Sequence, residues 1–365
     1  MIRVGLIGTG QISLANHLPG IGRCREAAVT ALCDTSEAAL ARASAQSGIT
    51  RTWTDPFALI READVDAVII ATPNASHHPI TMTAIARGLH VLCEKPLALT
   101  FADAAQMAGA ADAAGIRHMT AFTYRFVPAM RYIRHLVADG FVGEPWHFRA
   151  QRFMDWGRES LGWRQQAGLA GSGQVGDMLS HRIDFGHMLV GPIHEVMAHT
   201  TRIWDTRVDA QGGQHTSDLE DWVGCLALFT SGATGVLESS KVATSYAENG
   251  GGTRDRCEVN GFEGSLIYDL STPEIVLGGK RGGRLEPLTV PAEFTRWEGA
   301  TLEAGVDPQV AFRWIQDAEF VAAIRESRPA SPSFHDGARV QAVMQAIHQS
   351  ADRNQPVAVP DLPGA

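Results

Sequence analysis

The sequence predicts an α/β protein, with a doubly wound parallel sheet in the N-terminal half followed by an α+β domain built on a large, mostly antiparallel open sheet. Apolar, strand-like stretches alternate with helical periodicity as far as Phe122, which is typical of a parallel sheet covered by helices on both faces. Short strand-like stretches separated by glycine turns dominate the second half. Because 365 residues exceed what one hydrophobic core usually supports, we expect two domains, at residues 1–123 and 124–365.

The first element is an apolar strand that leads directly into a glycine turn and a helix. Gly8 permits the sharp turn, and Gly10 lacks the Cβ that would hold a pyrophosphate away from the backbone. The helix then presents a partial positive charge and free N–H groups, near Gln11 and Ile12. Ser13 stands where the dinucleotide fingerprint usually has a third glycine, and its small side chain still permits close packing. The pattern predicts a Rossmann cofactor turn; a purely structural turn is the alternative.

The second strand-like stretch, residues 29–33, ends in Asp34. A dinucleotide site usually has a carboxylate here, which accepts hydrogen bonds from the ribose hydroxyls of the adenosine. A carboxylate repels the 2′-phosphate of NADP, and Thr35 and Ser36 supply no arginine to hold one. We therefore expect NAD rather than NADP. The alternative is that Asp34 only caps the helix that starts near Glu37.

Two further apolar stretches, residues 65–71 and 90–93, are followed by Thr72-Pro73-Asn74 and by Glu94-Lys95-Pro96. Ligands of doubly wound sheets bind at the carboxyl ends of the strands, so both loops are candidates for cofactor contact. Most lysines are solvated, but a lysine at this edge would face the nicotinamide end of a dinucleotide, and Pro96 restricts its backbone to extended conformations. We expect helices that begin near Pro56 and cover 77–87 and 100–115, and a further strand at 117–122.

The second half contains one strong helix, predicted over 174–190 and stopped by Gly191-Pro192. Residues 155–173 carry many glycines, Trp156, Trp163 and Arg164 without a clear period, which predicts a loop over a cleft. Further helices are expected at 127–139, 309–326 and 336–352, and strands at 146–154, 194–204, 222–229, 233–242, 256–260, 265–269 and 357–359.

The predicted helix over 174–190 carries Asp177, His181 and Asp184, which project from one face at about 100° per residue. Three interpretations are open. The first is a structural network with Arg182 or a backbone partner. The second is a metal site, for which no fourth ligand has an informative spacing and His187 is displaced to the edge of the face. In the third, His181 is a general base, since its ordinary pKa lies near neutrality and the carboxylates would orient it.

Composition excludes several classes of function. The formal net charge of −9 argues against nucleic acid or an anionic membrane surface as a partner. No apolar stretch approaches the roughly 20 residues of a membrane span. The first strand starts at once, so we expect no export signal. The five cysteines are scattered without a Cys-x-x-Cys pair, which favours a cytoplasmic protein without structural zinc, and we expect no metal.

These motifs, taken in order over residues 1 to about 190, resemble the glucose-fructose oxidoreductase / inositol dehydrogenase / MocA family. The resemblance implies a Rossmann domain, a second domain whose open sheet builds homodimers or homotetramers, and hydride transfer between nicotinamide and a secondary alcohol of a sugar, glycoside or cyclitol. Ser13 is the departure from the pattern. The motifs that carry the resemblance are Gly8-Thr9-Gly10, Ala71-Thr72-Pro73-Asn74 with His77, Glu94-Lys95-Pro96, Tyr124-Arg125-Phe126, Gly143-Glu144-Pro145, Trp163-Arg164 and residues 173–184.

Matched residue by residue, the resemblance makes Lys95, Asp177 and His181 the catalytic lysine, aspartate and histidine. Trp156 and Trp163 are candidate platforms for the C–H faces of a sugar, or simple packing residues. The resemblance puts Asn74, His77, Glu94 and Arg164 near the cofactor, and Arg125 and Asp184 near the substrate.

We therefore expect an NAD-dependent dehydrogenase in which His181 removes the hydroxyl proton, Lys95 stabilises charge on the oxygen and Asp177 orients the pair. Two other functions stay open. One is a lyase or hydrolase that oxidises C3 transiently and then eliminates a glycosidic substituent. The other is a non-catalytic sugar sensor, which would have no need of the lysine, aspartate and histidine.

Overall fold

The computed structural model describes residues 1–156, 161–209, 211–246, 255–269, 275–297, 300 and 308–362. The chain separates into two compact units, residues 1–126 with 296–338, and residues 127–295 with 339–365. The first break lies close to the predicted boundary. However, the sequence analysis assigned 296–338 to the second domain, whereas its contacts place it in the first.

The reason is the packing of helix α9 (Pro308–Arg325). This helix contacts α1 (Leu18–Gly22), the π-helix η1 (Ser13–His17) and the short helix η3 (Thr123–Phe126), all of which belong to the first unit. The contact surface buries Phe312 and Ile315. A segment near the end of the chain thus completes the core of the N-terminal unit, which a division along the chain does not reveal.

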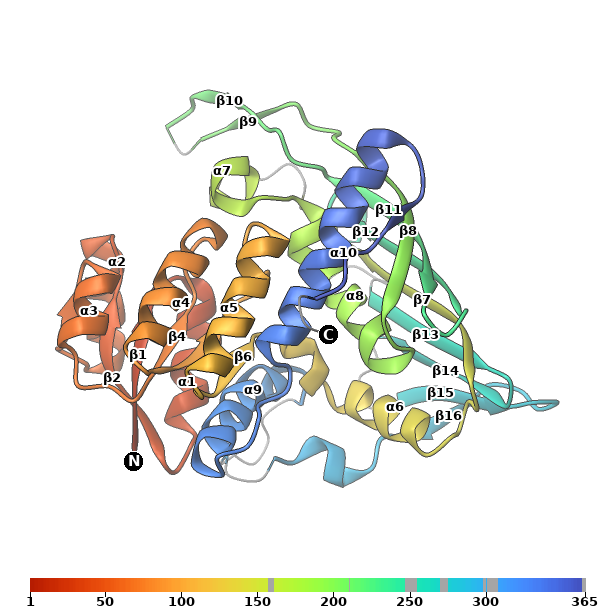
Figure 1. Cartoon of the computed structure of the whole chain (residues 1–365), viewed down its shortest axis with the longest axis horizontal. Coiled ribbons are helices and arrows are strands. Elements are labelled where there is room, and N and C mark those ends of the chain that lie inside the picture. The colour runs from red at the N-terminus through yellow and green to blue at the C-terminus, as the bar shows by residue number, and fades with distance from the viewer. Residues whose placement is uncertain are drawn as a thin grey trace. The chain divides into compact units, whose positions relative to one another are not determined.

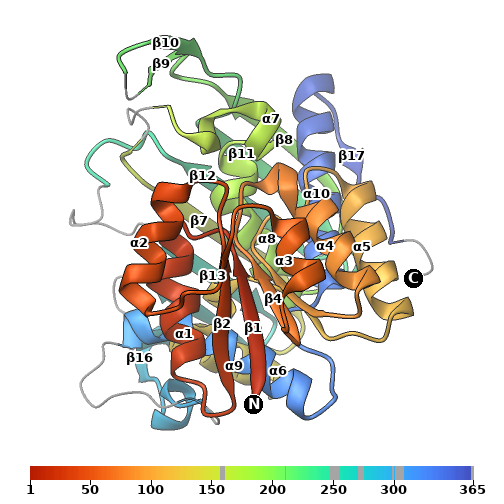
Figure 2. The ribbon, with the colours of Figure 1, turned by 90° about the vertical axis from the view of Figure 1, so that its left-hand side faces the viewer.

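The first unit contains a six-stranded, wholly parallel sheet with the strand order β3-β2-β1-β4-β5-β6. Helices α1 and α2 (Glu37–Ser47) lie on one side of these strands, and α3 (Pro56–Glu62), α4 (His77–Ala86) and α5 (Phe101–Ala113) lie on the other (Figure 2). The predicted doubly wound fold is confirmed. The strands are β1 (Ile2–Ile7), β2 (Ala27–Cys33), β3 (Thr52–Trp53), β4 (Ala67–Ile70), β5 (His90–Cys93) and β6 (His118–Thr120).

The strand order reverses between β1 and β4, which makes their carboxyl ends the crevice where such folds bind ligands. The glycine turn follows β1, and Asp34 follows β2. Thr72-Pro73-Asn74 and Glu94-Lys95 follow β4 and β5. All the predicted cofactor loops of this unit therefore lie at one edge of the sheet.

The second unit contains a nine-stranded sheet with the order β16-β15-β14-β13-β7-β12-β11-β8-β17, in which only the pair β12 and β7 is parallel. Helices α6 (Pro128–Ala138) and α8 (Ser180–Leu189) pack on one face (Figure 1), and the buried ring of Phe148 lies next to Gly186 of α8. The strands are β7 (Pro145–Phe153), β8 (Ile193–Thr201), β11 (Trp222–Phe229), β12 (Thr234–Ser240), β13 (Asp255–Gly261), β14 (Gly264–Asp269), β15 (Ile275–Lys280), β16 (Glu286–Thr289) and β17 (Val357–Ala358).

The opposite face of this sheet is exposed. The strand register places Leu226, Val236 and Arg149 side by side, and the same row continues to Leu277 through β13 and β14. Leu226 is 58% exposed and Leu277 is 37% exposed. One face of the sheet thus carries large apolar side chains that no element of the described chain buries.

Four segments of the second unit differ from the expectation. Strands β15 and β16, and the hairpin β9 (Thr206–Val208) with β10 (Gln214–Thr216), have no counterpart in the sequence analysis; β15 contains Gly278 and Gly279, which weaken a strand pattern. The expected loop contains the helical turn η4 (Trp163–Gln165) and α7 (Ala167–Ala170), and residues 157–160 lie outside the described ranges. The expected helix over 174–190 is two elements, the π-helix η5 (Val175–Leu179) and α8. The last helix is α10 (Phe334–Arg353).

Among the helices of the described ranges, none combines the length and apolar composition that a membrane span requires.

Candidate active site

The glycine turn after β1 has the geometry that a pyrophosphate site requires. Gly8 has φ +90°, and a Cβ there would lie 2.4 Å from the carbonyl oxygen of Ala71, so no other residue fits. Gly10 is exposed, and a Cβ there would meet no atom within 4 Å, so its backbone is open to a ligand. Gln11 and Ile12 supply the first N–H groups of the helix. These residues fit a dinucleotide.

Ser13 explains how the turn tolerates the missing third glycine. Its side chain is fully buried, and its hydroxyl donates to the carbonyl oxygen of Gly8 at 2.5 Å. The serine thus fits under the turn and satisfies its own polar atom.

Asp34 holds the turn as well as presenting a charge. Its Oδ2 accepts from the backbone N–H of Thr9 at 2.7 Å and from the Thr9 hydroxyl at 2.9 Å, and its Oδ1 accepts from the N–H of Ser36. The capping alternative is wrong, because the Ser36 hydroxyl caps α2 by accepting from the N–H of Ala39. Asp34 therefore lies beside the cofactor turn with part of its surface open.

The loops after β4 and β5 are joined by His77. Its two ring nitrogens each lie 2.9 Å from a carbonyl oxygen, that of Pro96 and that of Thr72, and the side chain is fully buried. Burial lowers the pKa of His77 below its usual range. The ring is therefore a support between the two loops. Asn74 is also buried, while Thr72, Pro73, Glu94 and Lys95 are partly exposed.

Arg125 belongs to the first unit and is also largely internal. Its side chain is 9% exposed, and its guanidinium donates to Asp336 at 3.1 Å. Burial would raise the pKa of Asp336, but Arg125 and the N–H of Ser333 lower it below its usual range. In this structure Arg125 fastens the segment that leads into α10 to η3.

In the second unit, the stretch that carries the predicted catalytic residues is anchored at its start. Gly173 is essential there, since a Cβ would lie 2.0 Å from the carbonyl oxygen of Glu220. The carboxylate of Glu220 accepts from the N–H of Val175 at 2.9 Å, and the amide oxygen of Gln174 accepts from the Ser239 hydroxyl at 2.7 Å. These contacts fix where η5 begins.

Asp177 lies in η5, and His181 and Asp184 lie in α8. A π-helical turn contains more residues than an α-helical turn, so a rotation of about 100° per residue describes α8 but not the segment from Asp177 to His181. Asp177 is 19% exposed and faces Arg164, with Nε of the arginine 3.9 Å from its Oδ1. His181 and Asp184 are almost fully buried. Arg182 pairs with Asp255 in the interior.

The tryptophans of the predicted loop have different surroundings. Arg164 stacks on Trp163, with its guanidinium carbon 4.5 Å from the ring centre. Trp156 is partly exposed, and its backbone N–H donates to the carbonyl of Lys241. Trp163 therefore supports Arg164, whereas Trp156 is partly exposed with its ring nitrogen buried.

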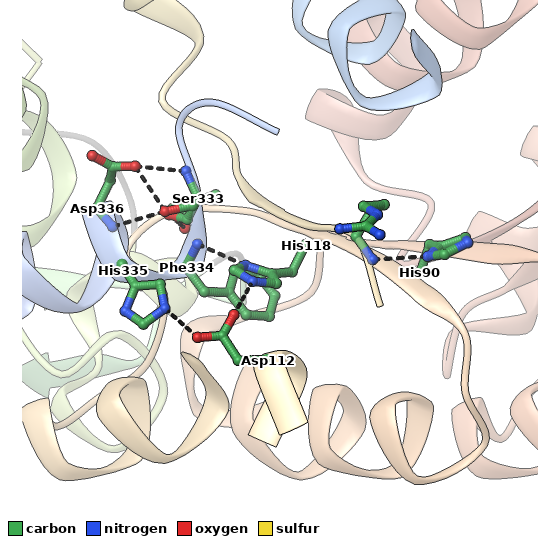
Figure 3. Close-up of polar contacts among 9 residues, drawn as sticks. His90, Asp112, His118, Ser333, Phe334, His335 and Asp336 are labelled. Atoms are coloured by element: carbon green, nitrogen blue, oxygen red, sulfur yellow. Dashed lines mark hydrogen bonds and ion pairs between the residues drawn. The ribbon is translucent and has the colours of Figure 1, made fainter. Parts of the chain in front are cut away.

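The described residues contain one group whose atoms are spaced for a metal, Asp112 with His118 and His335. Nε2 of each histidine faces an oxygen of Asp112, at 3.0 Å and 2.6 Å (Figure 3). However, Nδ1 of His118 accepts the backbone N–H of Phe334 at 3.0 Å, so Nε2 must keep the proton and cannot bind a metal. The group is a hydrogen-bonded clamp that fastens the start of α10 to α5 and β6.

Two family models match the chain in sequence. The model described as "Oxidoreductase family, NAD-binding Rossmann fold" matches residues 2–122, and the model described as "GFO/IDH/MocA C-terminal domain" matches residues 130–267.

The chain belongs to the GFO/IDH/MocA oxidoreductase family. It is an NAD-binding oxidoreductase, and the predicted family and cofactor are confirmed.

Curated members of the GFO/IDH/MocA family resemble the chain over most of its length. Levoglucosan dehydrogenase from Pseudarthrobacter phenanthrenivorans is 30% identical over 348 residues, which cover 88% of this chain and 87% of the relative. Myo-inositol 2-dehydrogenase from Thermotoga maritima is 27% identical and covers 78% of this chain and 80% of its own. A solved structure of levoglucosan dehydrogenase in complex with NADH and L-sorbose superimposes with a TM-score of 0.90 at 27% identity, covering 100% of both chains.

Several residues that shape these loops were missed by sequence reasoning. Glu220 and Ser239 anchor η5 from strands or turns that begin more than 40 residues away, and His17 contacts Glu94 from the first helix. The one signal of this contact in the sequence was a histidine seven positions after Gly10. Its partner, Asp317, is 300 positions away, and no local pattern connects them.

NAD should bind more tightly than NADP, by roughly tenfold or more, because Asp34 repels a 2′-phosphate. Asp34→Ala should narrow the gap, and it should also weaken NAD itself because Thr9 loses its acceptor. Thr9→Val is the matched control: it removes one hydrogen bond but keeps the charge, so the preference for NAD should persist. Calorimetric titration with both dinucleotides measures this, and equal or tighter binding of NADP would contradict it.

Proposed function

We propose that the protein is an NAD-dependent dehydrogenase that oxidises a secondary alcohol of a sugar, glycoside or cyclitol. The observation that carries this proposal is the match over the full chain to levoglucosan dehydrogenase in complex with NADH and a sugar. Relatives named myo-inositol 2-dehydrogenase and D-glucoside 3-dehydrogenase, the latter from Escherichia coli, support the same class of substrate.

The chain's own residues fit the cofactor and the reaction. When bound, NAD supplies the hydride acceptor. Gly8, Gly10 and the first helical turn would hold its pyrophosphate, and Asp34 its adenosine ribose. The loops after β4 and β5, which His77 supports, would line the rest of the dinucleotide.

We assign the proton chemistry to Lys95, Asp177 and His181. His181 takes the proton of the substrate hydroxyl, and the ammonium of Lys95 donates a hydrogen bond that stabilises negative charge on the same oxygen. Asp177 orients the pair, and Arg164, 3.9 Å from its carboxylate, holds Asp177. Trp156 offers a ring for the apolar face of a sugar. We also assign Asp184 and Arg125, both largely buried, to the substrate region.

The relative named D-glucoside 3-dehydrogenase supports oxidation at C3. A second candidate reaction starts with this oxidation, continues with elimination of the glycosidic substituent, and ends with return of the hydride from NADH to the sugar, so that no net NADH forms. The two candidates differ in whether reduced cofactor accumulates.

A substrate panel separates these candidates. Cyclitols, free sugars, an anhydrosugar and glycosides are incubated with protein and NAD, with absorbance of NADH and product masses recorded. Net NADH with a keto product two mass units below the substrate is the expected result. Cleavage of a glycoside without net NADH would favour elimination, and binding of sugars without either product would favour a sensor.

Lys95→Met should lower kcat by about a hundredfold or more, because the lost charge acts on the developing alkoxide, while NAD affinity changes by no more than a few-fold. His181→Ala should lower kcat by about a hundred- to ten-thousandfold and flatten the acidic limb of the pH profile. Because both residues act on one hydroxyl, the double variant should lose much less than the product of the single losses. Lys280→Met, at an exposed lysine, is the control. If the single losses in kcat multiply in the double variant, or if His181→Ala leaves the pH profile unchanged, another residue is the base.

We also propose a cytoplasmic location. All five cysteines are free and buried, which is typical of proteins from a reducing compartment.

We further propose that the exposed face of the nine-stranded sheet joins copies of the chain into a homodimer or homotetramer, because Leu226, Leu228 and Leu277 lie on it. Leu226→Glu should shift the protein toward monomers, as measured by light scattering after size-exclusion chromatography. Ile203→Glu places the same charge on an exposed apolar residue outside the strands and should leave the oligomer intact. A monomeric unmodified protein would refute the proposal.

A further inference from the structure

His17 is fully buried at the end of η1, with a carboxylate at each of its ring nitrogens. Nδ1 lies 2.7 Å from Oδ1 of Asp317, and Nε2 lies 3.1 Å from Oε1 of Glu94. An ionised carboxylate only accepts hydrogen bonds, so both ring nitrogens must donate. A histidine that donates from both nitrogens is the imidazolium cation.

The electrostatics of the three side chains agree with this charge. Burial alone would lower the pKa of His17, but Asp317 and Glu94 outweigh it and raise the pKa to about 10. Burial raises the pKa of Asp317. For Glu94, burial is outweighed by His17 and Lys95, and its pKa is lowered. Since the folded pKa of His17 lies above its ordinary value, its stabilising effect is complete below about pH 6.5 and is lost as the pH rises through about 10.

His17 joins three separate segments of the first unit. It sits on the helix that follows the glycine turn, Glu94 follows β5, and Asp317 belongs to α9. The approach of α9 is close: a Cβ on Gly20 would lie 2.1 Å from Oδ2 of Asp317. Only a glycine at position 20 allows the carboxylate to reach His17.

Glu94 connects this charge to Lys95. One of its oxygens faces His17, and the other accepts from the backbone N–H of Lys95 at 3.2 Å. The same carboxylate thus contacts the buried cation and the backbone of the residue to which we assign the alkoxide. If it were released, this carboxylate would be a strong competing partner for the neighbouring ammonium.

We propose that His17 is a positioning residue for Lys95: its cationic ring holds the Glu94 carboxylate, whose other oxygen accepts from the Lys95 backbone N–H, and so limits competition of this carboxylate for the lysine ammonium. This inference rests on the proposed role of Lys95 in the reaction. Asp317 is the counterion that keeps His17 oriented. Loss of His17 therefore impairs turnover more than cofactor binding.

His118 provides a control within the same unit. It is also buried and also faces a carboxylate, Asp112, at 3.0 Å. Its other nitrogen accepts an N–H, so it must be neutral, and burial lowers its pKa (Figure 3). Two buried histidines of one unit, each beside an aspartate, are therefore expected to differ in charge: His17 is cationic and His118 is neutral.

The first experiment reads those states in the intact protein. Two-dimensional NMR of protein with 15N-labelled histidine is recorded from pH 6 to 9, with His17→Gln and His118→Gln spectra used for assignment. The signals of His17 should stay at imidazolium positions throughout, and those of His118 at the positions of a neutral ring protonated on Nε2. A neutral His17 at pH 7 would overturn the proposal without any measurement of activity.

The second experiment measures turnover and NAD affinity. His17→Gln should lower kcat by about 10- to 100-fold, since a small misplacement of a reacting group has effects of that size, with NAD affinity within about threefold. Glu94→Gln added to His17→Gln should recover a large part of kcat, because the amide still accepts from the Lys95 N–H but no longer attracts the ammonium. His118→Gln should keep kcat within about twofold. Equal losses in His17→Gln and His118→Gln, no recovery in the double variant, or a parallel loss of NAD affinity would each overturn the proposal.

Removal of His17 leaves the buried carboxylate of Asp317 and the partly buried carboxylate of Glu94 without their cation, so His17→Gln can fail to fold. In that case the double variant His17→Gln with Asp317→Asn, which removes one of the two negative charges, replaces His17→Gln in the comparison of kcat and NAD affinity with His118→Gln. The outcome is also separable from that of the proposed function. If Lys95→Met keeps full activity, the proposed role of Lys95 is wrong, while NMR still measures the charge state of His17. If Lys95→Met is impaired but the His17 variants do not give the expected result, the proposed function stands and the positioning role of His17 is wrong.

Discussion

The close approach of β1 to the loop after β4 is the constraint on which the cofactor unit depends. At Gly8 the backbone has a positive φ and lies so near Ala71 that no side chain fits. This contact occurs where the strand order reverses, so it opens the crevice and turns the first helix toward it. The Ser13 hydroxyl and the Asp34 carboxylate then hold the turn from below and from the side. The predicted cofactor loops of this unit all lie at the same edge of the sheet.

Buried polar groups, rather than apolar packing alone, decide how those loops are held. His77 bridges the loops after β4 and β5 through two carbonyl oxygens, and His17 bridges the second of these loops to α9 through two carboxylates. For His17 and His118, the chemistry of the partners sets the charge of the ring. A histidine between carboxylates must be a cation, whereas His118, between a carboxylate and an N–H, must be neutral. The second unit uses Glu220 in the same way, to fix the start of η5.

The second unit separates two tasks between the faces of one sheet. Helices α6 and α8 cover the inner face, and α8 carries His181 and Asp184 in the interior. The outer face keeps Leu226 and Leu277 exposed in one row. A sheet with one covered and one open face is stable as a layer, but its open apolar side favours association. The substrate chemistry and the assembly that we propose thus fall on opposite faces of the same sheet.

The sequence by itself determined the elements whose cause is local. The glycine turn, Asp34 after β2, the parallel αβ alternation and the strands of the second sheet other than β15 and β16 follow from turn chemistry and hydrophobic periodicity. The ordered motifs identified the family. Tertiary structure alone decided the rest, because the partners lie far apart in the chain. Residues 296–338 join the first unit, Asp317 meets His17 across 300 positions, and Asp112, His118 and His335 form a clamp whose tautomer excludes a metal. The π-helical turn at Asp177 could not be predicted from the sequence either, because the periodicity argument assumes α-helical spacing. Glu220 and Ser239, which anchor this turn, also lie far along the chain.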